Sequence, residues 1–160
     1  MTVLADKFCL KLESPIVEDF LTLRNKVGWG DLDANLAEKS LNNSLFHVII
    51  RYDDQLVGMG RVVGDGAMYF YIQDVVVDPS YQKQGIGAAL MDKIEGYLSD
   101  VTSQGSTIGL LAAQGKEGFY SRYDYTQRPN SSLGHGMCKF IPKRLENRCF
   151  RTRVGEEYKA

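Results

Sequence analysis

Two hydrophobic periodicities follow one another along this chain. Alternating apolar and polar positions, or short apolar runs bounded by turn residues, predict strands, and apolar positions three and four residues apart predict helices. The predicted strands are residues 8–12, 45–52, 55–63, 67–78, 106–113 and 135–141. The predicted helices are residues 16–25, 32–41, 86–100 and 116–123. This order predicts an α/β (α+β) fold with a mixed sheet, antiparallel through its hairpins and parallel where a helix crosses over.

Three local features of this pattern lead to more specific expectations. Ser14 and Pro15 precede the first predicted helix and fit its N-cap and first position. Residues 67–78 form a nearly unbroken apolar run, which predicts a strand buried on both faces. The stretch GMGRVVG, residues 58–64, is interpreted as a flexible part of a hairpin strand.

Composition and charge narrow the class of protein. The 160 residues are 44% apolar and 24% charged, as in an ordinary globular domain. We therefore expect a single domain over residues 1–160, with its core near 7–142 and a charged C-terminal extension at 143–160. The formal net charge of −1 gives no bulk attraction to nucleic acid or to an anionic membrane, so neither is expected as a partner.

The cysteines and the N-terminal residues bear on compartment and metal binding. Cys9, Cys138 and Cys149 have no CxxC spacing, which disfavours a disulfide framework and a zinc site. No metal is therefore expected, and the thiols are expected to be reduced. No signal peptide or apolar membrane span is recognised in the sequence, which leads us to expect a cytoplasmic protein.

The most informative stretch is YQKQGIG, residues 81–87, between a predicted strand and a predicted helix. The first turn of a helix has unpaired N–H groups and the positive end of the macrodipole, which together form an anion site. Glycines at this turn let a phosphate approach the backbone without meeting a β-carbon, and Lys83 adds a cation. The predicted ligand is an anion of the pyrophosphate kind.

Two common phosphate-binding motifs do not fit this stretch. The Walker pattern GxxxxGK[ST] is absent, and GxGxxG fails because Leu90 stands at the position of the third glycine. QKQGIG does match the Q/R-x-x-G-x-G/A pyrophosphate loop of the GNAT superfamily of acetyl-CoA-dependent N-acyltransferases, and the predicted elements resemble that family in order across residues 7–142. The resemblance implies a mostly antiparallel sheet of six to seven strands with a splayed central strand pair, flanked by about four helices.

The resemblance also implies where acetyl-CoA binds. In the family, the strand before the loop splays from its neighbour and pairs with the pantetheine arm through its backbone, and the loop wraps the pyrophosphate. Carried over by position, the strand residues are Val75, Val76 and Val77, and the loop residues are Gln82, Lys83, Gln84, Gly85, Ile86, Gly87 and Ala88. The N–H of Val75 is the expected donor to the thioester carbonyl.

Tyr120 and Asp74 are the candidate catalytic residues. Tyr120 lies in EGFYSRYDY, which is similar to the family's FYxxxGF pattern, and a phenol with a pKa of about 10 carries a proton for the departing thiolate at neutral pH. Asp124 and Tyr125 replace the family's Gly-Phe, and Asp124 is able to adopt the left-handed conformation of the glycine. The alternative for Tyr120 is a core aromatic residue with a satisfied hydroxyl.

Asp74 is a carboxylate within the apolar run that precedes the loop. It is expected to hold a water relay, to attract a cationic substrate, or to act as a base with a pKa raised by burial. The alternative is a carboxylate paired with a nearby arginine or hydroxyl group. The family also implies where the acceptor binds; the candidate residues are Arg24, Trp29, Asp31, Gln73 and Arg128.

The expected function is transfer of an acetyl group from acetyl-CoA to a primary amine by direct attack, without a covalent enzyme intermediate. A small-molecule amine is the first expectation for the acceptor, and a peptide or protein amine is the alternative. A catalytically silent acyl-CoA-binding or sensor protein of the same fold is the competing class. The family often forms dimers, so a homodimer is also considered.

Overall fold

Five strands between residues 8 and 109 form one sheet. The structure is a computed structural model that describes residues 3–142, and the chain forms two compact units that divide after Gly115. The first unit contains the whole sheet. Its strands are β1 (Phe8–Lys11), β2 (Phe46–Tyr52), β3 (Gln55–Gly64), β4 (Tyr69–Val77) and β5 (Thr107–Gly109).

The sheet has the order β1-β2-β3-β4-β5. The first four strands pair antiparallel, and β5 pairs parallel to β4. Parallel neighbours need a crossover connection, which is here α3 (Ile86–Val101), preceded by a short 3-10 turn, η1 (Pro79–Tyr81). The predicted mixed sheet is therefore confirmed, with five strands among residues 3–142 in place of the six to seven expected.

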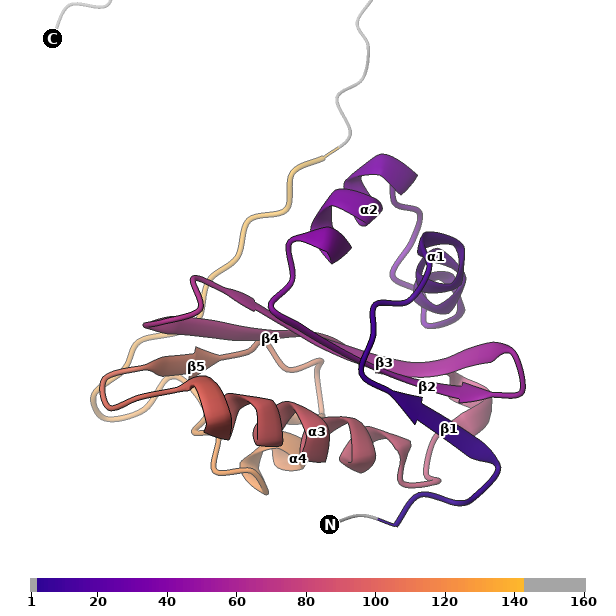
Figure 1. The fold of residues 1–160 in the computed structure, drawn as a ribbon. Coiled ribbons are helices and arrows are strands. Elements are labelled where there is room, and N and C mark those ends of the chain that lie inside the picture. Colours follow the sequence, from indigo (N-terminus) through magenta and orange to yellow (C-terminus); the bar gives the residue numbers. More distant parts are fainter. Residues whose placement is uncertain (1–2, 143–160) are drawn as a thin grey trace, which may run out of the picture. The chain divides into compact units, whose positions relative to one another are not determined.

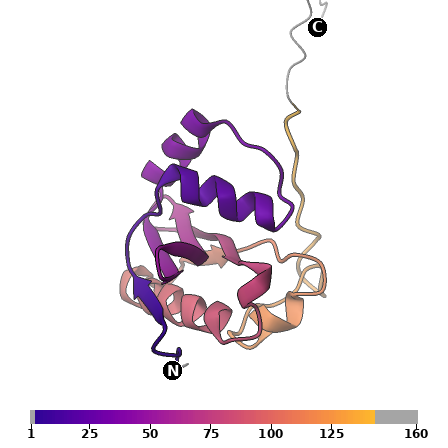
Figure 2. The same ribbon diagram turned by 90° about the vertical axis from the view of Figure 1, so that its right-hand side faces the viewer.

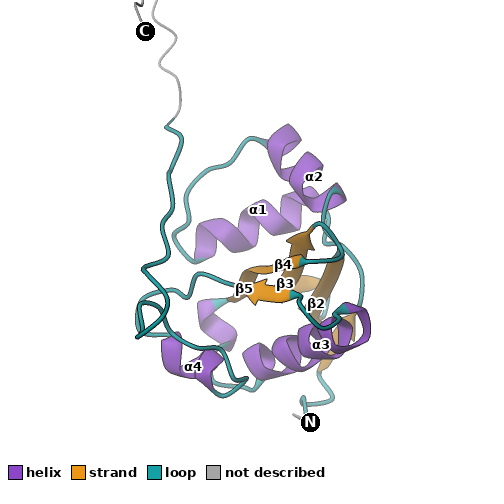
Figure 3. Cartoon of the chain, turned by 90° about the vertical axis from the view of Figure 1, so that its left-hand side faces the viewer, coloured by secondary structure: helices purple, strands orange, loops and turns teal. Residues whose placement is uncertain are grey.

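Helices cover both faces of this sheet (Figure 1). Helices α1 (Val17–Lys26) and α2 (Ala34–Asn42) lie on one face, and α3 lies on the other, as the turned views in Figures 2 and 3 also show. The core under α1 and α2 is made of apolar side chains from both helices and three strands: Phe20, Leu23, Ala37, Leu41, Ile49, Leu56, Met59 and Val76. No helix within residues 3–142 is long and apolar enough to cross a bilayer.

Two glycines of β3 let α3 approach the sheet closely. A β-carbon on Gly58 would lie 2.6 Å from Cγ2 of Ile86, and one on Gly60 would lie 2.8 Å from Cδ1 of Ile94. Both distances are well inside van der Waals contact, so a larger residue would push the helix away. The interpretation of GMGRVVG as hairpin flexibility is therefore wrong for these two positions, which are packing positions.

A bulge interrupts β4 at the residue before the cofactor segment predicted from the sequence. The β3–β4 register passes from Met59↔Val76 to Arg61↔Gln73, and Asp74 has a φ of +53° in the left-handed region. A bulge inserts an extra residue and changes which face the following side chains occupy. Residues 70–77 alternate between buried and partly exposed side chains, so the expectation of burial on both faces is wrong.

The start of α1 also differs from expectation. Its N-cap is Ile16, without a side-chain hydrogen bond, because the hydroxyl of Ser14 donates instead to the carbonyl of Pro15 at 3.2 Å. Helix α2 has the more typical arrangement, in which the carboxylate of Asp33 accepts a hydrogen bond from the N–H of Leu36 at 2.9 Å.

The second unit contains one short helix, α4 (Glu117–Ser121), within its described residues 116–142. The strand expected at 135–141 is not formed, and Met137 and Phe140 in that segment are 92% and 87% exposed. Apolar alternation allows a strand but does not supply the neighbouring edge that its backbone groups need. The extension expected at 143–160 lies outside the described residues.

Candidate functional site

Strand β4 has an open edge over its second half. It pairs with β5 only from Tyr69 to Tyr71, and β5 ends at Gly109, whereas β4 continues to Val77. From Ile72 onward, no strand within residues 3–142 covers this side of β4. The two parallel strands therefore separate as the expected splayed pair, and the freed backbone groups are available to an extended ligand.

Hydrogen bonding at the end of β4 shows which backbone groups face the open edge. The N–H of Asp78 donates to the carbonyl of Val57 at 2.8 Å, so it points toward β3. Backbone groups of successive strand residues point to opposite sides, so those of Val77 and Val75 point toward the open edge and those of Val76 toward β3. The carbonyl of Val77 is already bound, at 3.2 Å, by the side-chain amide of Gln82. Val75 is thus the valine best placed to offer its backbone to a ligand.

The loop between η1 and α3 has the backbone shape of an anion-binding turn. Lys83 has a φ of +61°, and Gly85, the N-cap of α3, has a φ of +82°. These left-handed residues bring the chain sharply into the helix, where the first-turn N–H groups have no acceptor within the helix. Residues 82–85 are exposed, whereas Ile86 is buried against the sheet and fixes the start of the helix.

Helix α3 is long enough for its dipole to contribute at this end. It has 16 residues and no acidic residue in its first turn, so no carboxylate there repels an anion. Gly87 and Ala88 are partly exposed on that first turn. Lys83, exposed on the loop, adds a positive charge beside it. The features expected for a pyrophosphate site from the sequence are therefore present together.

Asp78 anchors the loop at its beginning. This carboxylate is only 2% exposed and accepts hydrogen bonds from Lys26 Nζ at 2.7 Å, Gln55 Nε2 at 3.1 Å and the N–H of Ser80 at 2.9 Å. Burial raises the pKa of Asp78, but the bonds from Lys26 and Ser80 outweigh it and hold the pKa below its usual value. Asp78 stays ionised and connects the loop to α1 and β3.

Asp74 lies in a buried cluster of charged and polar side chains. Its Oδ2 accepts a hydrogen bond from Arg61 Nε at 2.8 Å, and its Oδ1 lies 3.5 Å from Arg24 Nη1. Gln73 Nε2 donates to Oδ1 at 3.1 Å. The bulge explains this arrangement, since it allows the neighbouring residues Gln73 and Asp74 to reach the same face of the sheet. We call Arg24, Arg61, Gln73 and Asp74 the arginine–aspartate cluster.

The partners of Asp74 favour a structural role for this carboxylate. Both of its oxygens are engaged, and its side chain is 1% exposed. Arg61 Nη1 donates hydrogen bonds to the Ser40 carbonyl of α2 at 3.1 Å and to the Ser44 hydroxyl, in the connection between α2 and β2, at 3.0 Å. Asp74 is therefore part of a hydrogen-bonded network that joins β3, β4 and α1.

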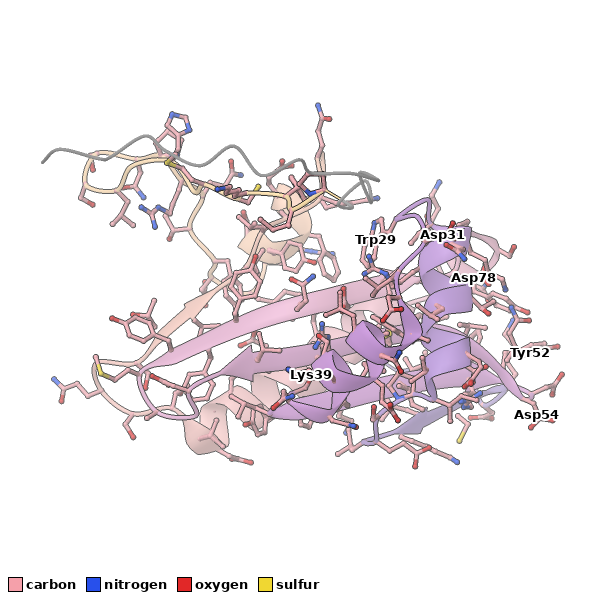
Figure 4. All side chains as sticks on the ribbon, turned by 90° about the horizontal axis from the view of Figure 1, so that it is seen from above. Trp29, Asp31, Lys39, Tyr52, Asp54 and Asp78 are labelled. Atoms are coloured by element: carbon pink, nitrogen blue, oxygen red, sulfur yellow. The ribbon has the colours of Figure 1, made fainter. Side chains whose placement is uncertain are left out.

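Arg24 and Trp29 lie at the surface side of the arginine–aspartate cluster. The guanidinium carbon of Arg24 is 5.2 Å from the Trp29 ring centroid and 5.5 Å from that of Phe20. Trp29 is 41% exposed and lies between Gly28 and Gly30, both with positive φ, on the loop that joins α1 to α2. Asp31, also exposed, lies on the same loop (Figure 4).

Two further predicted site residues belong to the second unit. The Tyr120 ring packs edge-on against Phe119 at 5.0 Å and Tyr125 at 6.5 Å, and burial raises the pKa of its phenol above the usual 10.0. Asp124 has a φ of +65°, so it does adopt the left-handed conformation expected at this position. The guanidinium of Arg128 donates from Nε to the Gly134 carbonyl at 2.7 Å.

The structure thus joins three of the predicted residues, Arg24, Gln73 and Asp74, through hydrogen bonds and an ion pair. Sequence reasoning did not identify Arg61, Lys26 or Asp78. A signal for Arg61 was present, because it is the charged residue of an otherwise apolar strand, as Asp74 is in the next strand. Buried charges of opposite sign on neighbouring strands are expected to pair.

Comparison with known proteins identifies the family. The model of the acetyltransferase (GNAT) domain matches residues 30–147, which is more than half of the chain. The chain belongs to the GNAT acetyltransferase family. The predicted family and fold class are therefore confirmed.

Individual relatives agree with this assignment. A crystal structure of a protein of unknown function from meticillin-resistant Staphylococcus aureus, described as a probable acetyltransferase, has a TM-score of 0.75 and 32% identity. The match covers 82% of this chain and 99% of that one. The uncharacterized N-acetyltransferase ycf52-like of Prochlorococcus marinus is 31% identical over 114 residues, 69% of this chain and 62% of that protein. The histone acetyltransferase TAP1 of Glycine max is 36% identical over 89 residues, 49% of this chain and 38% of that protein. The chain thus spans less than two thirds of these two curated relatives.

Proposed function

We propose that this GNAT protein transfers the acetyl group of acetyl-CoA to the primary amine of a small molecule. The observation that carries the proposal is the open edge of β4, which leads directly into the exposed loop of residues 82–85 and the N-terminus of α3. A ligand with an extended arm that ends in a pyrophosphate fits this arrangement, with the arm along the strand edge and the pyrophosphate at the loop. Hydrogen bonds along the edge and at the helix start would bind the two parts in order.

The residues that would hold acetyl-CoA fall into two groups. The backbone of Val75 faces the open edge and is assigned to the pantetheine arm and the thioester carbonyl, with the N–H of Val77 beside it. The loop residues are assigned to the pyrophosphate; they are Gln82, Lys83, Gln84, Gly85, Ile86, Gly87 and Ala88. Acetyl-CoA supplies an activated acetyl thioester, whose carbonyl carbon is open to attack by an amine.

The chain's own groups assist this transfer in three ways. The acceptor nitrogen attacks as the neutral amine; a C–N bond forms, the C–S bond breaks, and the electron pair leaves on sulfur. The N–H of Val75 stabilises the charge that develops on the carbonyl oxygen. The phenol of Tyr120 gives its proton to the sulfur, and the raised pKa keeps that proton available throughout the neutral range. The proton lost by the nitrogen passes to solvent, since Asp74 is engaged by two arginines.

Calorimetry and a turnover assay test the proposal together. Acetyl-CoA titrated into the purified chain should bind with one site, and a panel of primary amines should then release free thiol from acetyl-CoA. Absence of any binding heat with folded protein would contradict the assignment of the open edge and loop. Desulfo-CoA serves as a control, because it should bind without supporting turnover.

The competing function is a catalytically silent acyl-CoA sensor. The pairing of Asp74 favours the sensor, because a carboxylate bound on both oxygens does not supply a free base beside the open edge. Tight acetyl-CoA binding without thiol release on a broad amine panel would support the sensor. Turnover on histone peptides but on no small amine would instead support a protein acceptor, as the printed name of the Glycine max relative indicates for that protein. The cytoplasmic location and a homodimer stay predictions; three of the curated relatives have chloroplastic in their names.

A further inference from the structure

The arginine–aspartate cluster has unbalanced charge. It contains two guanidinium groups, Arg24 and Arg61, and one carboxylate, Asp74, which leaves one net positive charge. Within residues 3–142, no second carboxylate forms a salt bridge with either arginine. His47, next to Arg61 across β2 and β3, does not change this balance, because burial lowers the pKa of its imidazole and keeps it neutral at about pH 7.

The two arginines share Asp74 unequally. Arg61 holds Oδ2 at 2.8 Å and has two further acceptors, the carbonyl of Ser40 and the hydroxyl of Ser44. Arg24 is 3.5 Å from Oδ1, an oxygen that already accepts a hydrogen bond from Gln73. A contact of that length is at the limit of a hydrogen bond, so Arg24 is the guanidinium whose charge is left over.

Arg24 also has an unused binding edge. Its Nε is buried and has no hydrogen-bond partner among the described residues. Nη1 points to Asp74, so Nε and Nη2 form the side of the guanidinium that binds a carboxylate through two parallel hydrogen bonds. Trp29 and Phe20 lie near the guanidinium, stabilise its charge and provide no acceptor for these N–H groups.

We infer that the acceptor of this enzyme is an amine that also carries a carboxylate, and that Arg24 binds that carboxylate through Nε and Nη2. That the bound molecule is an acetyl acceptor depends on the proposed function. That a carboxylate binds at Arg24 depends only on the arginine–aspartate cluster. The net positive charge of the cluster would repel a simple cationic amine. The carboxylate of an amino acid would instead neutralise that charge. The cluster adjoins Val75, because Asp74 is the preceding residue of β4.

Access to this edge depends on the Trp29 loop. Because Nε is sealed from solvent, a carboxylate reaches it only when the surroundings of the guanidinium open. Trp29 is the exposed residue beside the guanidinium, and its flanking residues Gly28 and Gly30 have no neighbouring atoms within 4 Å of a β-carbon built on them. The proposed binding therefore requires the exposed Trp29 side chain to move away from the guanidinium.

Matched pairs of amines test the inference by turnover. Phenylalanine is compared with phenethylamine, and lysine with 1,5-diaminopentane; each pair differs by the carboxylate. The wild-type enzyme should show a kcat/KM for the carboxylated member about 10- to 100-fold higher, and Arg24→Gln should remove the preference by raising KM. Arg51→Gln is the control, because Arg51 is also ion-paired and its side chain has the same 19% exposure as that of Arg24.

A binding measurement separates this inference from the proposed function. N-acetylphenylalanine and N-acetylphenethylamine are titrated into the chain in the presence of CoA, which requires no catalysis. Selective binding of the carboxylate by wild type and Arg51→Gln, but not by Arg24→Gln, supports the anion site even if no amine is acetylated. Equal binding of the two compounds, no binding of either, or an unchanged preference in Arg24→Gln overturns it, even if acetyl transfer is observed. Circular dichroism and the urea midpoint of each variant confirm that it is folded.

Discussion

Asp74 shows how a single residue combines a functional position with a structural role. Its left-handed φ of +53° forms the bulge in β4, and its buried carboxylate holds Arg61 and Arg24. A bulge beside a site is a conserved way to redirect a strand in many folds. In this chain the bulged strand is β4, whose open edge is assigned to acetyl-CoA. The ion pairs with the arginines and the shape of the proposed site therefore both depend on Asp74.

Replacing Asp74 tests that structural role. Asp74→Asn leaves two guanidinium groups facing a neutral amide, so the free energy of unfolding should fall by about 3 kcal/mol. Asp19→Asn is the control, because the Asp19–Arg51 pair is partly exposed and should contribute less than about 1 kcal/mol. Urea unfolding at neutral pH measures both. Equal losses, or a pH–rate profile that shifts in Asp74→Asn without a loss of stability, would restore a catalytic role for this carboxylate.

Tyr120 is tested by its kinetics. Tyr120→Phe removes the phenolic proton, so kcat should fall by about 100-fold or more while the Kd of acetyl-CoA changes little. Because burial raises the phenol pKa, wild-type kcat should show no loss from Tyr120 ionisation in the neutral pH range. Tyr123→Phe, three residues along in the same segment, is the control. A Tyr120→Phe enzyme with wild-type kcat would remove Tyr120 from the mechanism.

At the level of single elements, α3 is the helix whose N-terminus is proposed to bind the pyrophosphate. Its N-cap, Gly85, requires a positive φ, so a β-branched residue there would be strained as well as obstructive. Gly87, within the first helical turn, is the cleaner position for a test, since the helical conformation is open to any residue.

Gly87→Val should raise the Kd of acetyl-CoA by at least about tenfold, because its side chain would occupy the space of the phosphate. Gly96→Val is the matched control, since Gly96 lies in the same helix and has no atom within 4 Å of a β-carbon built on it. Calorimetry gives the two Kd values, and thermal unfolding shows whether both substitutions affect helix stability alike. If the two variants bind acetyl-CoA equally, the loop is not the pyrophosphate site.

The periodicity of the sequence located most elements but not their irregularities. The predicted helices at 16–25 and 86–100 correspond to α1 and α3 with ends that differ by at most one residue, because long amphipathic patterns have a strong period. The bulge at Asp74 was not predicted, since a slip of register depends on the partner strand. The strand at 135–141 was wrong for a similar reason: pairing requires an edge that local sequence does not describe.

The candidate site was predictable where local motif and local structure coincide. The exposed loop before α3 could be located from the sequence because its glycines and the following helix are contiguous in the chain, and its binding of pyrophosphate stays a prediction. The arginine–aspartate cluster was recognised only in part, because Arg61 and Asp74 are 13 residues apart and meet through strand pairing. Asp78 was missed because its partners Lys26 and Gln55 come from two other elements.

At the scale of the whole molecule, stability should depend on pH through His47. Burial lowers the pKa of His47 below 6.5, and Nε2 is 2.9 Å from the Leu41 carbonyl while Nδ1 is buried without a partner among the described residues. A lowered pKa means that the unfolded chain binds the proton more readily. The contribution of His47 to stability is therefore complete above 6.5 and is lost as the pH falls through the folded-state pKa.

Urea midpoints measured from about pH 7.5 to pH 5 test this dependence. The wild-type midpoint should decrease over the range, and His47→Gln, whose amide can still donate to the Leu41 carbonyl, should show a smaller decrease. His135→Gln is the control, because His135 is exposed. Identical pH dependence in wild type and His47→Gln would show that other groups cause the decrease.

The last turn of α1 holds β4 through Arg24 on Asp74 and holds the residue that follows β4 through Lys26 on Asp78. Val75 and Val77, which are assigned to acetyl-CoA, lie between Asp74 and Asp78, and the Trp29 loop begins directly after Lys26. An engineer who grafts a different acceptor loop onto this scaffold should therefore keep both basic residues and their spacing. A graft that rotates the end of α1 would change the affinity for acetyl-CoA as well as the choice of acceptor. The two properties are therefore expected to change together.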